Sequence, residues 1–179
     1  MNGIRIPKQR GFTIVELLIV IVVIAILATT TIVAYNGIQV RARDARRTSD
    51  IASILKGLET YKVLNNEYPR ATSIAGDGNW EYSTDTAGTF MEYLSVTFSN
   101  KIPVDPVNDL THRYQYYVYS VGDLASYGCP THKGSMFVFY ANGFENTANM
   151  PSSNTSLVCT GRTWSGSTTN YFKYKFENG

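Results

Sequence analysis

Residues that carry out catalysis or bind transition metals are scarce in this chain. Its 179 residues include two histidines and two cysteines. His112 and His132 stand alone beside polar residues, and no serine, aspartate or cysteine lies at a motif spacing that would recruit either to catalysis. The cysteines have neither C-x-x-C spacing nor a nearby pair of histidines. We therefore predict no catalytic residues, no metal site, no cofactor and no enzymatic activity.

Proline is absent between Pro7 and Pro69, and this absence allows a long uninterrupted helix. We predict one helix from about Phe12 to about Leu64. At a rise of 1.5 Å per residue, about 53 residues would form a rod of roughly 80 Å.

Acidic residues are absent from the first eleven positions, which carry Arg5, Lys8 and Arg10. A largely apolar run follows from Phe12 to Ala34, and as a helix it is long enough to cross a hydrocarbon core of about 30 Å. Basic residues that precede a membrane span stay in the cytoplasm. We therefore predict a single membrane span, with residues 1–11 in the cytoplasm and the body of the chain outside it.

One carboxylate, Glu16, interrupts the start of the apolar run. A charged side chain in the middle of a membrane helix costs about 2.5–3.5 kcal/mol on insertion scales, so it usually has a partner and a function. At the level of the lipid headgroups Glu16 would need no partner. An ordinary secretory signal has the same polarity, but cleavage after Ala28 or Ala34 would leave a bulky isoleucine where a small residue is preferred.

The segment 8–18, Lys-Gln-Arg-Gly-Phe-Thr-Ile-Val-Glu-Leu-Leu, resembles the prepilin signature of type IV pilins and type II secretion pseudopilins. In that family a membrane peptidase cuts after the glycine and N-methylates the new first residue. The resemblance implies cleavage between Gly11 and Phe12 and methylation of Phe12. It also implies that the α-ammonium of a neighbouring subunit neutralises Glu16 in a filament, so that Glu16 acts in assembly.

The apolar positions beyond the membrane segment have the spacing of one helical face: Ile51, Ile54, Leu55, Leu58 and Tyr61. Arginines precede them at positions 41, 43, 46 and 47. A basic stripe can bind nucleic acid, but this one lacks interleaved aromatic residues. A solvated or intersubunit ion-pair face is the favoured interpretation, with nucleic acid as a weakly supported alternative partner.

The remaining residues contain strand patterns and are numerous enough for one compact core. Phe172, Tyr174 and Phe176 alternate with lysines, and the ranges 114–121 and 136–140 are rich in strand-forming residues. We expect three or four antiparallel strands on the apolar face of the helix. We read 71–100 as a variable loop with a short helix near Phe90 to Leu94.

These elements predict an α+β protein with a type IV pilin-like fold, in which a long N-terminal helix packs against a small antiparallel sheet. The predicted domains are a leader peptide (1–11), a stem helix (12–65, with 12–34 as its membrane-spanning half) and an extracytoplasmic head (66–179).

Two further segments resemble the same family. Residues 61–69 finish the helix with an Asn-rich turn and Tyr-Pro, and residues 103–106 form a Pro-x-Asp-Pro loop before the first head strand. Asp105, Asn108 and Asp109 could offer oxygen ligands to Ca²⁺. Because their spacing is not that of an EF-hand, turn capping is the favoured interpretation.

Cys129 and Cys159 lie in the part of the chain expected outside the cytoplasm, where oxidation is allowed. We predict a disulfide between them. In the chain-entropy account, closing a loop of about 30 residues is worth roughly 3–4 kcal/mol.

The preferred function is that of a structural pilin in a type IV pilus used for adhesion, twitching motility or DNA uptake. A type II secretion pseudopilin is the alternative, and a membrane-anchored monomeric enzyme or binding module is a third hypothesis. The resemblance implies as partners further copies of the chain in a helical filament, prepilin peptidase, the pilus assembly machinery and the membrane. It also implies an inner-membrane subunit that becomes part of an extracellular surface filament.

Overall fold

The computed structural model describes residues 11–70, 80–85, 90–99, 101–154 and 156–178. Its chain forms two compact units, Met1–Gln39 and Val40–Gly179. Arg5, Lys8 and Arg10 of the predicted leader lie outside the described residues, and so do 71–79, 86–89 and 100 of the loop predicted over 71–100.

One helix, α1, runs from Ile14 to Asn65 and confirms the long helix predicted from the absence of proline. Its C-terminal end is closed by Asn66, which adopts a left-handed backbone conformation with φ of 61°. The Asn66 N–H donates to the carbonyl oxygen of Lys62 at 2.7 Å, the closure expected where a helix ends in a left-handed residue. Asparagine tolerates this conformation better than most residues.

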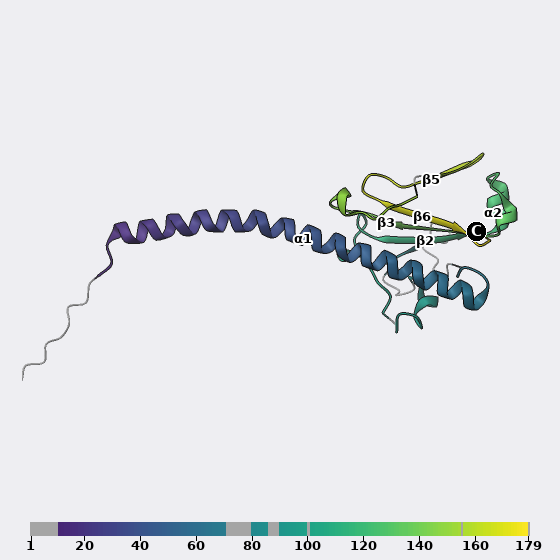
Figure 1. The fold of residues 1–179 in the computed structure, drawn as a ribbon, viewed down its shortest axis with the longest axis horizontal. Helices are drawn as coiled ribbons and strands as arrows, with labels where there is room; N and C mark the ends of the chain where they lie inside the picture. The colour runs from purple at the N-terminus through teal and green to yellow at the C-terminus, as the bar shows by residue number, and fades with distance from the viewer. Residues whose placement is uncertain (1–10, 71–79, 86–89, 100, 155, 179) are drawn as a thin grey trace, which may run out of the picture. The chain divides into compact units, whose positions relative to one another are not determined.

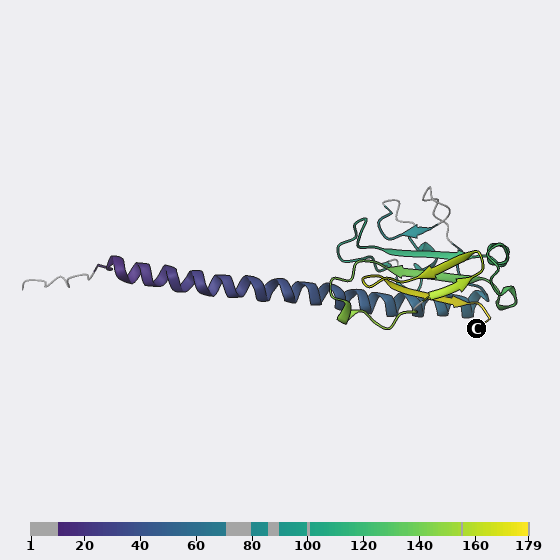
Figure 2. The same cartoon turned by 90° about the horizontal axis from the view of Figure 1, so that it is seen from above.

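The second unit contains a four-stranded antiparallel sheet of strand order β1-β2-β3-β6. Its strands are β1 (Glu81–Tyr82), β2 (Tyr114–Tyr119), β3 (Met136–Ala141) and β6 (Tyr171–Phe176). The long helix and this small sheet together confirm the predicted α+β class. Within the second unit, the strands lie alongside α1 (Figures 1 and 2).

The strand predicted over 114–121 ends two residues early, at Tyr119, because a helix begins there. Ser120 caps α2 (Val121–Ser126): its hydroxyl accepts from the Asp123 N–H at 3.1 Å, and the Asp123 carboxylate accepts from the Ser120 N–H at 2.9 Å. The short helix expected near Phe90 is a single 3-10 turn, η1 (Glu92–Leu94).

A two-stranded antiparallel hairpin, β4 (Ser156–Cys159) and β5 (Arg162–Ser165), is an addition to the predicted fold. Its apolar residues Leu157, Val158 and Cys159 are consecutive and Trp164 stands alone in β5, so the apolar alternation that marked β6 is weak here. Two further 3-10 turns, η2 (Thr131–Lys133) and η3 (Thr147–Asn149), flank β3.

The four-stranded sheet is covered on both faces: the helix covers one, as predicted, and the hairpin covers the other. On one face, Ile54 and Leu58 of α1 are fully buried in a cluster with aromatic residues of β2 and β3. On the other face, Phe172 and Phe176 are buried in a second cluster with Trp164 of the hairpin. The alternating residues of β6 therefore face the hairpin.

Candidate functional site

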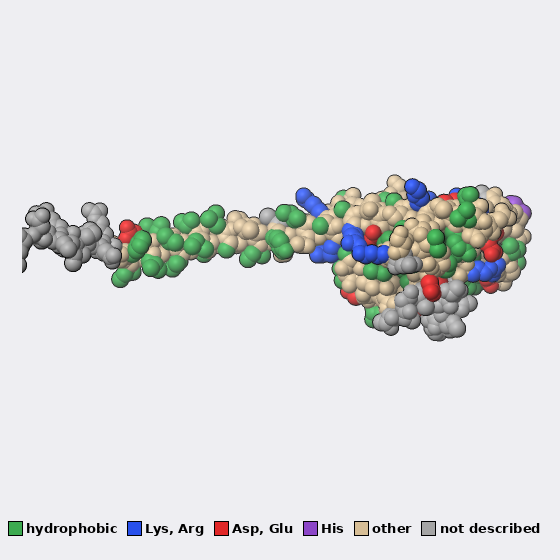
Figure 3. Space-filling view, turned by 90° about the horizontal axis from the view of Figure 1, so that it is seen from below, with side chains coloured by type: hydrophobic (Ala, Val, Ile, Leu, Met, Phe, Trp, Pro, Cys, Tyr) green, Lys and Arg blue, Asp and Glu red, His purple; other side chains and the backbone are tan. Residues whose placement is uncertain are grey.

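The helical part of the first unit exposes almost all of its apolar side chains. Phe12, just ahead of the helix, is 88% exposed and Leu27 is 60% exposed, and none of the apolar residues whose side chains the structure describes in this stretch is buried. Figure 3 shows apolar side chains along this part of α1, whereas basic side chains gather on the second unit. By length and composition the helix can cross a membrane. Such a surface requires lipid or other apolar helices around it.

Glu16 lies in the first turn of α1 and caps the helix together with Thr13. Its carboxylate accepts hydrogen bonds from the Thr13 N–H and the Thr13 hydroxyl, both at 2.8 Å. The Thr13 hydroxyl in turn accepts from the Glu16 N–H at 3.2 Å. This reciprocal arrangement is a capping box, and it places a negative charge at the positive end of the helix dipole.

Thr13 is missing from the predicted site residues, although the Thr-x-x-Glu spacing at the start of an apolar helix is the signature of a capping box. The structure adds partners within the chain to the neighbouring ammonium group that the resemblance implies for Glu16. Its own chain supplies two donors.

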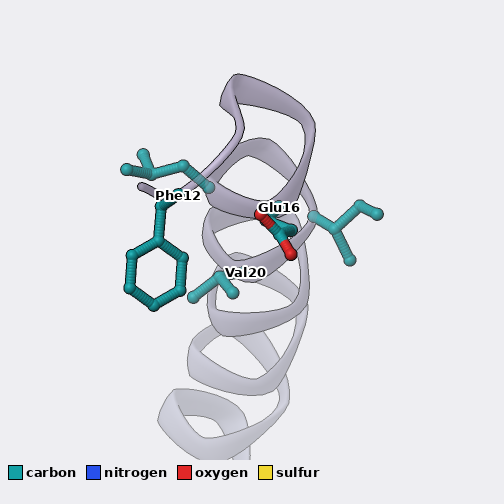
Figure 4. A pocket seen from close by; sticks show the side chains of 5 residues that line it. Phe12, Glu16 and Val20 are labelled. Atoms are coloured by element: carbon teal, nitrogen blue, oxygen red, sulfur yellow. The ribbon is translucent and has the colours of Figure 1, made fainter. Parts of the chain in front are cut away.

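Glu16 also lines a shallow hollow on the helix surface. The other lining residues are Phe12, Leu17, Ile19 and Val20, so the carboxylate is the single charged group in an otherwise apolar wall. Figure 4 shows the Phe12 ring and Val20 beside Glu16 at the first turns of the helix. The hollow can receive an apolar side chain together with a positively charged group.

Gly11 and Phe12, the predicted processing residues, are both exposed ahead of α1. A Cβ placed on Gly11 would have no other atom within 4 Å. Nothing in its surroundings therefore explains the glycine by packing.

The sequence predicts that the arginines at positions 41, 43, 46 and 47 form a solvated or intersubunit face. This prediction is wrong for Arg43 and Arg47, which form ion pairs within the chain. Arg47 is fully buried and bonds the Asp105 carboxylate at 2.7 and 3.1 Å, Asp44 at 2.9 Å and Glu145 at 3.1 Å. Arg43 also bonds Glu145, at 2.6 Å. These ion pairs connect α1 to two loops of the second unit.

The pKa values reflect this pairing. Burial disfavours the charged form of Arg47, but hydrogen bonds and attraction from Asp105, with further bonds to Glu145 and Asp44, outweigh burial and raise its pKa. Hydrogen bonding to Arg43 is the main reason that the pKa of Glu145 falls to about 2. Both groups are therefore charged at neutral pH.

The oxygens considered for Ca²⁺ bind donors of the protein. Asp105 accepts from the Val107 and Asn108 N–H groups, in addition to Arg47, and so acts as a turn cap. Asp109 accepts from Thr111 and His112. In the part of the chain that the structure describes, no group of three or more His, Cys, Asp or Glu residues is placed to hold a metal ion.

Cys129 and Cys159 form a disulfide with a Cα–Cα distance of 5.0 Å. It joins the segment after α2 to the end of β4, and thus holds the hairpin on the second core cluster.

A comparison with known families finds a match at this N-terminal helix and its first turn. Residues 6–32 match the family described as the prokaryotic N-terminal methylation motif. The type II secretion system core protein G of Escherichia coli (strain K12) is 39% identical over 99 residues, which are 55% of this chain and 67% of that protein. The corresponding protein of Pectobacterium carotovorum is 39% identical over 62 residues, 35% of this chain and 40% of that protein.

A third relative, the type IV wide pilus major component PilA4 of Thermus thermophilus, is 42% identical over 61 residues, 34% of this chain and 47% of that protein. The matches thus cover between 40% and 67% of the length of these relatives. No solved structure matches the chain significantly.

Proposed function

Since this chain belongs to the family of type IV pilins and type II secretion pseudopilins, we propose that it is a structural pilin that polymerises through α1 into a type IV pilus. The observation that carries the proposal is the exposed apolar part of α1 in the first unit, with Glu16 in its first turn. Only lipid or a bundle of like helices would cover that surface. The role is structural, not enzymatic.

Maturation comes first in the proposed sequence of events. Prepilin peptidase removes residues 1–11 by cutting between Gly11 and Phe12, and Phe12 becomes the N-methylated first residue. Both residues are exposed ahead of the helix, where a peptidase can reach them. The functional domains in this proposal are the leader (1–11), the stem (12–65, with 12–34 in the membrane) and the head (66–179).

Assembly depends on Glu16 in this proposal. In the membrane-bound subunit, Thr13 donates two hydrogen bonds to the carboxylate and lowers the cost of placing it in an apolar medium. In the filament, the α-ammonium of a neighbouring Phe12 adds the opposite charge, which uncharged donors cannot provide. The subunit thereby leaves the inner membrane for a filament outside the cell.

A pseudopilin of a type II secretion system is the second candidate function. The names of the core protein G relatives favour it. The disulfide-linked hairpin and the covered second face of the sheet make a substantial head, and this favours a surface pilus used for adhesion, twitching motility or DNA uptake.

One experiment separates the two candidates. Filaments sheared from cells would be imaged by electron microscopy, and their subunits identified by mass spectrometry, alongside an assay of secreted proteins in a deletion strain. A pilin should be abundant in the filaments, and its deletion should leave secretion intact. If the deletion strain loses secretion but keeps its filaments, the pseudopilin is favoured. If it keeps both secretion and filaments, both candidate functions are contradicted.

A further inference from the structure

Arg162 of β5 lies among three aromatic rings. Its guanidinium carbon is 5.3 Å from the ring centroid of Tyr119, 5.1 Å from that of Tyr127 and 5.3 Å from that of Trp164. One guanidinium N–H donates to the Tyr127 hydroxyl at 3.0 Å. Among the described residues, no carboxylate lies within ion-pair distance of Arg162, in contrast to Arg43 and Arg47.

The backbone around Arg162 is held in place. Arg162 pairs across the hairpin with Cys159, whose disulfide to Cys129 anchors the hairpin. The neighbouring Gly161 N–H donates to the Tyr127 carbonyl at 2.9 Å. The guanidinium is therefore preorganised, so a ligand that binds it need not restrain a mobile side chain.

Two buried polar groups belong to the rings around Arg162, the Tyr119 hydroxyl and the Trp164 ring N–H. They interact with each other, but neither forms a hydrogen bond of good geometry within the part of the chain that the structure describes. Buried polar atoms of this kind are few in native proteins. The half-buried cation Arg162 has no counter-ion among the described residues, so an outside anionic ligand would complete the pairing.

Further aromatic rings follow Arg162 on the face of the sheet that also carries the β4–β5 hairpin. The Tyr119 and Tyr117 ring centroids are 4.4 Å apart, and Trp80 stacks on Tyr117 at 5.2 Å with an interplanar angle of 29°. Tyr140 follows, 5.9 Å from Trp80. The rings of Tyr127, Tyr117, Trp80 and Tyr140 are half-buried, and we call these four residues the aromatic track.

The charges around the aromatic track favour one class of ligand. Residues 67–179 carry 7 basic and 10 acidic residues, so this part of the chain is acidic overall. Burial raises the pKa of Tyr117, and the nearby negative charge of Asp123 raises it further. Single-stranded nucleic acid binds grooves lined with several cations, whereas Arg162 is the basic residue that the contacts of the described residues place at the track. A lone planar guanidinium matches a carboxylate, which it can bond with two parallel N–H groups. Flat aromatic rings match the apolar faces of sugars.

We propose that Arg162 and the aromatic track form a binding site for acidic polysaccharide. Arg162 pairs with the carboxylate of a uronic acid unit, and the rings of Tyr117 and Trp80 stack on the adjoining sugars. This site is separate from the N-terminal helix, so it does not depend on the proposed filament role.

The test uses the full chain in detergent micelles and immobilised sodium alginate, with neutral dextran as the uncharged probe. We expect alginate to bind and dextran to bind at least tenfold more weakly. Arg162→Gln should weaken alginate binding at least tenfold. Arg162→Lys should also lose most binding, because lysine keeps the charge but lacks the planar fork. The matched control is Arg41→Gln, which removes an exposed arginine from α1 and should bind like wild type.

Two measurements keep the result interpretable if Arg162 variants unfold. Thermal unfolding and non-reducing peptide mapping report whether fold and disulfide persist. Trp80→Ala changes the track without removing a charge and should weaken binding several-fold. Failure of the wild-type chain to prefer alginate over dextran, or wild-type binding by a folded Arg162→Gln, would overturn the proposal. Equal or tighter binding of an oligo-dT strand would also overturn it and would identify a nucleic-acid site instead.

Discussion

Glu16 and Thr13 form a local hydrogen-bonded pair, and this pair changes how the charge in the apolar helix is understood. A capping carboxylate is held by two donors of its own chain. Its stabilisation in the unassembled subunit therefore needs no other protein. What the capping box cannot do is neutralise the charge, and that difference leaves a role for a neighbouring ammonium group.

Replacing Glu16 by glutamine tests this role. Glu16→Gln keeps size and hydrogen bonding but removes the charge, so we expect normal membrane insertion and leader removal with poor entry into filaments. Shearing cells and comparing the filament and membrane fractions measures the effect. Thr29→Val, a change at an exposed hydroxyl that bonds only Ala25 of its own helix, serves as the control. Filaments at wild-type level would show that the pairing is unnecessary.

Thr13→Val removes the hydroxyl that bonds Glu16 while leaving the Thr13 N–H in place. Loss of a capping side chain typically costs about 1 kcal/mol. We expect the membrane-bound subunit to be less stable towards proteolysis at its first turn and filament yield to fall, with Thr13→Ser restoring both. A yield equal to wild type in Thr13→Val would mean that the hydroxyl has no part in assembly.

At the scale of elements, the two parts of α1 face different surroundings. The part in the first unit buries none of its apolar stretch, whereas Ile54 and Leu58 are fully buried against the sheet. Arg43 and Arg47 lie near the start of the second unit. Arg43 bonds Glu145, and Arg47 bonds both Asp105 and Glu145, which lie in two loops. These ion pairs fasten the loops to the helix at one place.

The ion pairs predict a pH dependence. The pKa of Glu145 is lowered from 4.5 to about 2, so its contribution to stability is present above the ordinary pKa and is lost as pH falls towards the folded-state value. We expect the free energy of unfolding to decrease between pH 5 and pH 3, roughly, and to decrease less in Glu145→Gln. Urea unfolding of the full chain at the two pH values measures this. An equal decrease in the free energy of unfolding in the wild type and in Glu145→Gln would contradict the prediction.

The hairpin β4–β5 depends on its disulfide, because it contributes few apolar side chains to the core. We expect Cys129→Ser to reduce the free energy of unfolding by roughly 3–4 kcal/mol, the value for a loop of about this length. Denaturant titration with and without reductant measures it. Non-reducing peptide mapping of protein purified without reductant should show one cross-linked pair, and two separately alkylated thiols would be the contrary result.

For the whole molecule, maturation decides which residue begins the subunit. We predict that the native protein starts at N-methyl-Phe12, because the basic leader and Gly11 match the pattern of prepilin peptidase and Gly11 is exposed. Intact-mass analysis of protein from the producing cell checks both the cleavage and the methyl group. A start after Ala28 or Ala34 would indicate ordinary secretion and would contradict the filament role.

Local patterns in the sequence account for the long helix, the membrane-length apolar segment and two of the strands. Helix α1 follows from the absence of proline and the 3.6-residue period, both of which act over neighbouring residues. Strands β3 and β6 lie within one residue of their predicted limits, since alternation is also local. The N-terminal signature is likewise a contiguous motif, so its resemblance to a known family could be recognised from the sequence alone.

Tertiary structure decided the features that join distant segments. Arg47 meets Asp105 across 58 positions and Glu145 across 98, so no local pattern could show that this arginine is buried. The hairpin is defined mainly by the core it covers and the disulfide it carries, and its own composition is weakly patterned. The rings around Arg162 likewise come from β2, β5 and the end of α2. Pairing over such distances depends on the packing of the whole second unit, which periodicity does not encode.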